Sequence, residues 1–316
     1  MKKAVLFLLL LASVASPAQQ SGSGSALPNG TLQTSVNFPA ARIQTPTASD
    51  LYCAGFISRQ LASKDKFVAG GLESPSASRF TNGDAVYLSG TGYEADQQYT
   101  IVRELTDPNR YELFKGQWSA LKAAGLPYQE LARVKVIDVR GKTAIAQVEF
   151  SCDAVVPGDF AIPFVEKPSI AFHAPMRFDR FAPSNGQVSG RILLAKDFDS
   201  QMGNGGKVYM NIGASQGLKV GDYLRAVRSY MTAAHDPVDS LSLKASSTEV
   251  TQTKQAAVDP DFLTRTGGPV IHTADMPRRS VAEIVVVGTT PGTATGMIVY
   301  SAEPVNVGDG VELDPQ

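Results

Sequence analysis

One stretch of the chain has the spacing of a catalytic serine. Gly213-Ala-Ser215-Gln-Gly217 fits the Gly-x-Ser-x-Gly nucleophile elbow of α/β-hydrolases, and Asp259 or Asp261 and then His272 follow in the order that this enzyme class uses. An elbow must open a helix, whereas Gly221-Asp222 soon afterwards predicts a turn and a further strand. A hairpin loop is therefore the better interpretation, and a secreted serine hydrolase is the alternative.

The other candidate ligand residues lack the spacing that their chemistry needs. Gly203-Asn-Gly-Gly-Lys207 resembles a phosphate loop, but Gln201 stands where the first glycine belongs. Asp197-Phe-Asp199 begins like a calcium loop, but Met202 replaces its turn glycine. The histidines occur singly, without metal-ligand spacing, at His173, His235 and His272. The sequence predicts no catalytic residue, no cofactor and no metal site.

The chain contains two cysteines, Cys53 and Cys152. In an exported protein two cysteines usually pair, so we predict a disulfide between them, with two buried free thiols as the alternative. The two residues do not have Cys-x-x-Cys spacing, which is typical of redox catalysts. The bridge is expected to be structural.

The N-terminus has the three-part layout of a secretory signal peptide. The basic start Met1-Lys2-Lys3 is followed by an apolar run from Ala4 to Ala12 and by small residues that end at Ala18. The apolar run is far shorter than the ~20 residues that span a bilayer. We predict a signal peptide over 1–18 and a flexible leader, rich in Ser, Gly and Pro, over 19–50.

Composition narrows the choice of fold and partner. The formal net charge is -1 and there is no polybasic run, so the sequence argues against a nucleic-acid partner. No later segment is apolar enough to span a membrane, so no membrane span is expected after removal of the signal. With 28 Gly, 19 Pro and few helix-period stretches, the chain is expected to be all-β.

The strongest feature of the sequence is an internal duplication. Three pairs of blocks recur in the same order: Ala54–Ile57 with Ser189–Ile192, Asp84–Leu88 with Gly206–Met210, and Lys142–Ser151 with Gly292–Ser301. In this alignment Val188 replaces Cys53 and Ala302 replaces Cys152. Both cysteines are lost together, which supports their pairing and predicts a disulfide within the first copy only.

Each copy is predicted to form a small β-barrel or sandwich. We assign copy 1 to 51–165, a linker to 166–187 and copy 2 to 188–316, with a mobile loop at about 235–274. Phe114, Trp118 and Leu121 lie at helical spacing before Gly125 and predict one short helix in copy 1. Gly-Asp pairs predict turns, because Gly supplies a positive φ and Asp bonds the local backbone. These pairs start at Gly83, Gly158, Gly221 and Gly308.

The second copy resembles a known family in four blocks: Ser189–Ile192, Gly205–Asp222, Thr293-Ala294 and, at the end, Val307-Gly-Asp309. They look like an exported β module that often follows a peptidoglycan-binding LysM domain in Gram-negative envelope proteins. The module is also similar to the C-terminal domain of the flagellar T-ring-type protein family. The resemblance implies an exported β fold and supplies no catalytic residues, and the chain has no lysin motif of its own.

The leading functional hypothesis is a non-enzymatic, exported binding or scaffolding component of the cell envelope, located in the periplasm or outside the cell. Its expected partner is an envelope protein or a cell-wall polymer, and self-association into a homo-oligomer remains open. The alternatives are a secreted hydrolase using Ser215 and a carbohydrate-binding module. Aromatic side chains exposed on one sheet face would favour the carbohydrate-binding module.

Overall fold

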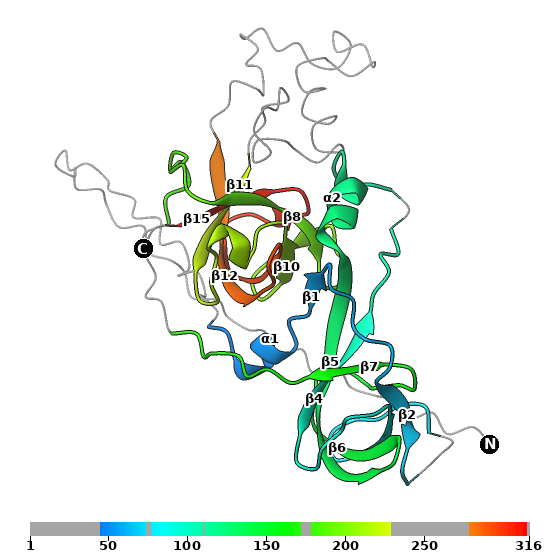
Figure 1. The fold of residues 1–316 in the computed structure, drawn as a ribbon. Helices are drawn as coiled ribbons and strands as arrows, with labels where there is room; N and C mark the ends of the chain where they lie inside the picture. Colours follow the sequence, from blue (N-terminus) through cyan, green and yellow to red (C-terminus); the bar gives the residue numbers. More distant parts are fainter. Residues whose placement is uncertain (1–44, 74–76, 110, 172–177, 229–277, 315–316) are drawn as a thin grey trace, which may run out of the picture. The chain divides into compact units, whose positions relative to one another are not determined.

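A computed structural model of the protein describes residues 45–73, 77–109, 111–171, 178–228 and 278–314. Within these ranges the chain is mostly antiparallel β-structure, with two short α-helices and one 3-10 helix (Figure 1). The predicted signal peptide, most of the leader and the loop at 235–274 lie outside the described residues. The all-β prediction is confirmed.

Barrel 1 is a closed barrel of six strands in the order β5-β4-β7-β2-β3-β6, which a β5–β6 pairing closes. Its strands are β2 (Phe67–Gly71), β3 (Ala85–Ser89), β4 (Gln98–Glu104), β5 (Leu126–Arg140), β6 (Thr143–Ser151) and β7 (Phe160–Pro163). Buried and solvent-contacting residues alternate along its strands, so every second side chain points into the barrel. The inward residues Val86, Leu88, Ala144 and Ala146 are fully buried.

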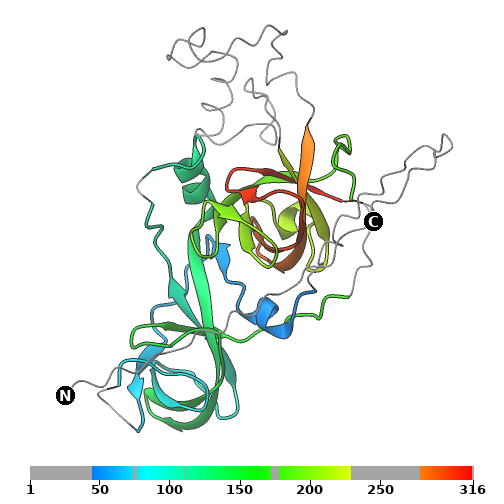
Figure 2. The same cartoon turned by 180° about the vertical axis from the view of Figure 1, so that it is seen from behind.

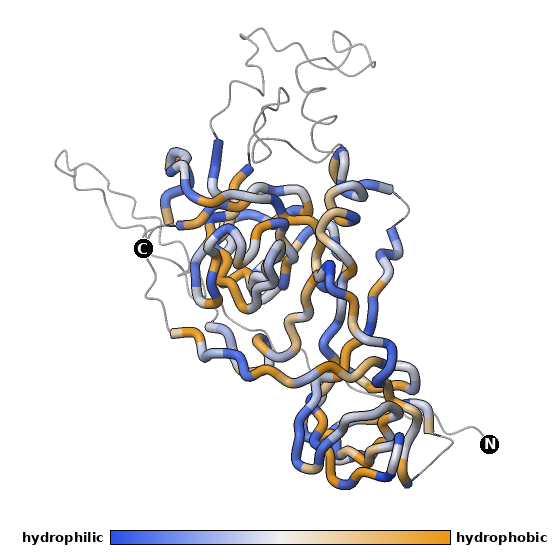
Figure 3. The backbone as a smooth tube through the Cα atoms, viewed as in Figure 1, coloured by the Kyte–Doolittle hydropathy of each residue, from blue (hydrophilic) through white to orange (hydrophobic). Residues whose placement is uncertain are grey.

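Barrel 2 is closed by six strands in the order β10-β13-β12-β11-β15-β8. Its strands are β8 (Ser189–Ala195), β10 (Lys207–Met210), β11 (Tyr223–Arg228), β12 (Arg279–Thr289), β13 (Ala294–Ser301) and β15 (Gly310–Leu313). A two-stranded ribbon joins β9 (Gln201–Met202) to β14 (Val305–Asn306). The strands of both barrels carry hydrophobic positions (Figure 3).

The two barrels have the same strand topology and register, so the internal duplication is confirmed. Strands β2 to β7 take the places of β8, β10, β11, β12, β13 and β15. Tyr87 pairs with Ile145 in barrel 1 as Tyr209 pairs with Thr295 in barrel 2. The isolated bridge between Phe80 and Val155 corresponds to the β9–β14 ribbon.

One part of the sequence alignment is wrong. Ala54–Ile57 does not correspond to Ser189–Ile192, because β1 (Phe56–Ser58) lies outside barrel 1 and pairs with the first residues of the long strand β5 (Figure 2). The counterpart of β8 is β2: Val68 N–H donates to Asp159 O as Ile192 N–H donates to Asp309 O. Barrel 1 therefore begins at β2, and Val188 is not the counterpart of Cys53.

Both α-helices are short. Helix α1 (Ala48–Tyr52) begins inside the range predicted for the leader, because the Thr47 side chain caps it by accepting the Asp50 N–H. Helix α2 (Gln117–Ala124) confirms the predicted helix and ends at Gly125. Its buried side differs from the prediction, since Gln117 is buried and Trp118 is 52% exposed.

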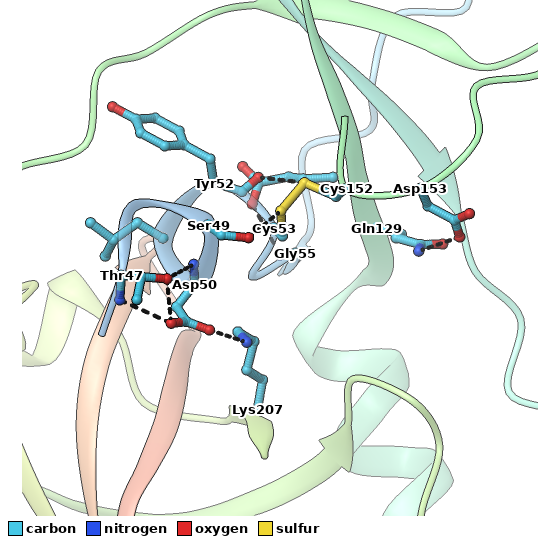
Figure 4. The surroundings of a disulfide bond; sticks show 12 residues. Thr47, Ser49, Asp50, Tyr52, Cys53, Gly55, Gln129, Cys152, Asp153 and Lys207 are labelled. Atoms are coloured by element: carbon cyan, nitrogen blue, oxygen red, sulfur yellow. Dashed lines mark hydrogen bonds and ion pairs between the residues drawn. A yellow bond between two sulfur atoms is a disulfide. The ribbon is translucent and has the colours of Figure 1, made fainter. Parts of the chain in front are cut away.

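The predicted disulfide joins Cys53 to Cys152, whose Cα atoms are 5.6 Å apart. Cys53 caps the C-terminus of α1, and Cys152 directly follows β6. The expectation that the bridge lies within the first copy is corrected, because Cys53 belongs to a segment outside barrel 1. The bridge ties that segment to barrel 1 (Figure 4).

Candidate functional site

A cleft of about 360 Å³ is the candidate site, and the segment around α1 and β1 forms one of its walls. Helix α1 is fixed by an ion pair between Asp50 and Lys207 of 2.8 Å (Figure 4). Partial burial raises the pKa of the Asp50 carboxyl, but hydrogen bonds from Lys207 and Thr47 outweigh it and hold this pKa below its ordinary value. Leu51 packs onto Val285 and Val287 of β12.

The stretch that follows α1 lies across the outer face of barrel 2. Tyr209 Oη donates to Ala54 O at 3.1 Å, and Thr295 Oγ1 donates to Gly55 O at 2.8 Å. Thr293 Oγ1 donates to Ile57 O at 2.6 Å. Side-chain hydroxyls of barrel 2 therefore satisfy the backbone carbonyls of this stretch, which burial would otherwise leave unpaired.

Gly55 is required at its position. Its φ is +70°, and a Cβ there would stand against the Tyr209 hydroxyl and 2.7 Å from Tyr128 O. Its N–H donates to Glu130 Oε2 at 3.0 Å. Only glycine combines this backbone conformation with so close an approach to two chain segments.

An ion pair between the half-buried Lys167 and the buried Glu130 forms a second wall of the cleft. Lys167 Nζ lies 2.7 Å from Glu130 Oε1 and 2.8 Å from Oε2, and it also donates to Leu51 O at 2.7 Å. Glu130 is only 6% exposed. The pair joins the linker, strand β5 and helix α1, and each charge is matched by the other.

The remaining walls are largely apolar, and Val165, 72% exposed, stands at the rim. The lining residues come from the α1–β1 segment, strand β5, the stretch 165–168 and barrel 2: Gly55, Phe56, Glu130, Val165, Glu166, Lys167, Pro168, Val220, Val287, Gly288, Thr289, Thr290 and Thr295. The volume lies in the range of small ligand sites. Lys167 and Glu130 neutralise each other, the Thr295 hydroxyl is already engaged, and the third charged residue, Glu166, is exposed to solvent. The largely apolar interior of the cleft is therefore suited to hold an apolar group.

The nucleophile elbow, the alternative to the predicted hairpin loop, does not form in the structure. Ser215 is exposed in the 3-10 helix η1 (Ala214–Gln216), which ends at Gly217, and the chain then continues to β11 without an α-helix. The Ser215 N–H donates to Pro291 O at 2.9 Å, as expected for a loop held against the neighbouring hairpin. Asp259, Asp261 and His272, the other members of the hypothetical triad, lie outside the described residues.

We expect Ser215→Ala to leave the protein unchanged. Among the described residues no base is hydrogen-bonded to the exposed Ser215 hydroxyl, and substitutions at exposed loop positions cost within about 0.5 kcal/mol of unfolding free energy. A fluorophosphonate probe should label neither the wild type nor the variant. Labelling of the wild type that Ser215→Ala abolishes would instead establish the hydrolase.

The other sequence candidates gain no support as ligand sites. All three histidines lie outside the described residues, and no group of three or more His, Cys, Asp or Glu in the described ranges could hold a metal ion. The strongly exposed aromatic residues, Tyr111, Trp118 and Phe181, lie in the insertion between β4 and β5 and in the linker, not on a sheet face. The condition set for a carbohydrate-binding module is therefore not met by these residues.

The four Gly-Asp pairs form one repeated turn, as predicted. All four glycines have φ between +89° and +102°, and each aspartate accepts the N–H three residues earlier at 2.7 Å. Two of the aspartates have a further role that the sequence analysis missed. Asp159 and Asp309 also accept two hydrogen bonds from one guanidinium, that of Arg103 and of Arg228 respectively.

Sequence reasoning also missed Gly55, Glu130 and Lys167. Their hydrogen-bond partners lie 37 to 240 residues away along the chain, so no local pattern marks them. The arginines could have been found, because Arg103 and Arg228 each follow a valine near the end of equivalent strands, β4 and β11.

Comparison with known proteins adds no relative: neither a protein-family model nor a curated protein matches the chain. The resemblance to the LysM-associated module and to the T-ring-type family therefore stays a prediction. Over the described residues, no helix has both the length and the apolar character needed to cross a bilayer.

Proposed function

We propose that the protein is a non-enzymatic binding or scaffolding component of the cell envelope, exported through its signal peptide, and that the cleft holds an apolar part of an envelope partner. The observation that carries the proposal is the cleft itself: a largely apolar hollow in which Glu130 and Lys167 neutralise each other and the third charged residue, Glu166, is exposed to solvent. Such a site offers burial to a partner and no activated nucleophile.

Two further features support this role. Disulfides persist in oxidising compartments, which fits a periplasmic or extracellular location. The cleft is braced by an ion pair, by hydroxyl-to-backbone hydrogen bonds and by the disulfide-tethered α1 segment. A preformed site loses little conformational entropy when a partner binds.

Photo-crosslinking tests the proposal. Benzoylphenylalanine at position 165, at the rim of the cleft, should give a discrete adduct with an envelope component in cells that export the protein. Gly288→Leu should abolish that adduct, because Gly288 lines the cleft and a Cβ there meets only Thr295 Cβ, at 4.0 Å.

Gly203→Leu is the matched control. Gly203 lies in barrel 2 outside the cleft, with open space around its Cβ position, so this variant should keep the adduct. Circular dichroism melting should show that both variants fold. The proposal fails if position 165 gives no adduct, or if Gly288→Leu and Gly203→Leu give the same yield.

A further inference from the structure

The outer face of barrel 2 is covered by chain segments that precede or interrupt barrel 1. A row of four outward residues crosses this face and is buried; from β8 through β10 and β13 to β12 it consists of Leu193, Tyr209, Thr295 and Val287. Gln117 Nε2 of α2 donates to Leu193 O at 2.9 Å. The α1–β1 segment covers the rest of the row through its contacts with Tyr209, Thr295 and Val287.

Barrel 1 has an equivalent row, here called the open row: Ala69 of β2, Tyr87 of β3, Ile145 of β6 and Ile137 of β5. The equivalence follows from register. Ala69 and Leu193 are each the unpaired residue of a β-bulge, at equivalent positions of β2 and β8. Ile137 and Val287 are likewise the unpaired residues of equivalent bulges in β5 and β12. Between them, Tyr87 faces Ile145 as Tyr209 faces Thr295.

The open row remains in contact with solvent. Ile137 is 56% exposed, Ala69 is exposed, and Tyr87 and Ile145 are half-buried. The positions beside the open row are polar in barrel 1 and apolar in barrel 2. Lys135 and Gln147 occupy the positions equivalent to the buried Val285 and Met297. An apolar strip with a polar rim is typical of a protein–protein interface.

We propose that the open row is a self-association surface that takes a second copy of this chain. The same row of barrel 2 is already covered by this chain's own sequence, through the insertion between β4 and β5 and the α1–β1 segment. A second insertion, 229–277, interrupts barrel 2 at the equivalent place, between β11 and β12.

A neighbouring molecule that lays this second insertion on the open row would repeat between molecules the contact that the first insertion makes with Leu193 of barrel 2. Such a contact joins two different surfaces, so copies would add head to tail. This inference goes beyond the proposed function, because it holds whether or not the cleft binds a partner.

Crosslinking between two tagged forms of the mature protein tests the surface. With benzoylphenylalanine at position 137 in one form, irradiation of the mixture should give an adduct that carries both tags. Mass spectrometry should place the attachment in 229–277 of the other molecule. Adducts within a single molecule, or attachment elsewhere, would overturn the proposal.

A charge substitution gives an independent measurement. Ile137→Glu should weaken self-association about tenfold or more in sedimentation equilibrium, because it places a carboxylate in the apolar contact. Leu61→Glu is the matched control: Leu61 is 59% exposed in the loop before β2, outside the open row, and its replacement should change nothing. A wild type that stays monomeric, or equal weakening by both variants, would refute the self-association surface. Thermal melting of each variant separates loss of association from loss of folding.

Discussion

Replacing both Cys53 and Cys152 by alanine is expected to lower the free energy of unfolding by about 4–5 kcal/mol in the chain-entropy model. The two cysteines are separated by 99 residues, and the loop that they close contains five of the six strands of barrel 1. Without the bridge the unfolded chain gains the conformational freedom of that whole loop. The folded state also loses the covalent tie that holds α1 beside barrel 1.

Urea unfolding of the mature protein, followed by circular dichroism, measures this loss. The wild type treated with a reductant should unfold at the same urea concentration as the double variant, which controls for the substitutions themselves. Thiol titration of the unfolded, unreduced wild type should find no free sulfhydryl. Two titratable thiols, or a double variant as stable as the wild type, would contradict the assignment.

The strands and turns could be predicted because each is determined by residues that are close together in the sequence. Alternating residues such as Ala144 and Ala146 mark a strand with one buried face, and a Gly-Asp pair marks a turn wherever it occurs. Since both copies carry the same local signals in the same order, the duplication was also visible in the sequence.

The start of barrel 1 was misplaced because two stretches share a short pattern. Ala54–Ile57 and Ser189–Ile192 both contain Gly-x-Ile, but strand pairing is decided by partners far along the chain. Phe56 pairs with Tyr128, whereas Gly190 pairs with Val311. No local pattern distinguishes a strand that closes a barrel from one that lies beside it.

The cleft was not predicted for the same reason. Its walls come from the α1–β1 segment, strand β5, the stretch 165–168 and barrel 2, which meet only in the folded chain. No local sequence pattern predicts that Glu130 and Lys167 form an ion pair, because the two residues lie 37 positions apart.

Arg228→Ala is expected to cost about 3–5 kcal/mol of unfolding free energy, the range for breaking a buried ion pair from one side. Arg228 donates to Asp309 through Nε at 2.8 Å and through Nη2 at 2.6 Å, and also to Pro304 O at 2.8 Å. Both side chains are buried, so removing the guanidinium takes from the Asp309 carboxylate the cation that donates two hydrogen bonds to it.

The duplication supplies a matched control. Arg103 makes the same contacts with Asp159 and with Ala154 O in barrel 1, but its side chain is 32% exposed against 10% for Arg228. Water can therefore reach the Asp159 site when Arg103 is removed, and Arg103→Ala should cost less than Arg228→Ala. Equal losses in urea unfolding would show that burial does not control the strength of this contact.

The cost of Arg228→Ala should also depend on pH. Burial raises the pKa of the Asp309 carboxyl, and the hydrogen bonds from Arg228 oppose that rise. Without Arg228 the folded-state pKa should rise further above the unfolded value, so the variant keeps its stability at acid pH, where the carboxyl is protonated in both states, and loses it as pH rises through the folded-state pKa. Unfolding of the wild type and of Arg228→Ala compared at acid and neutral pH should therefore show the larger difference at neutral pH. A difference that stays constant with pH would mean that Asp309 remains charged in the variant and finds another partner.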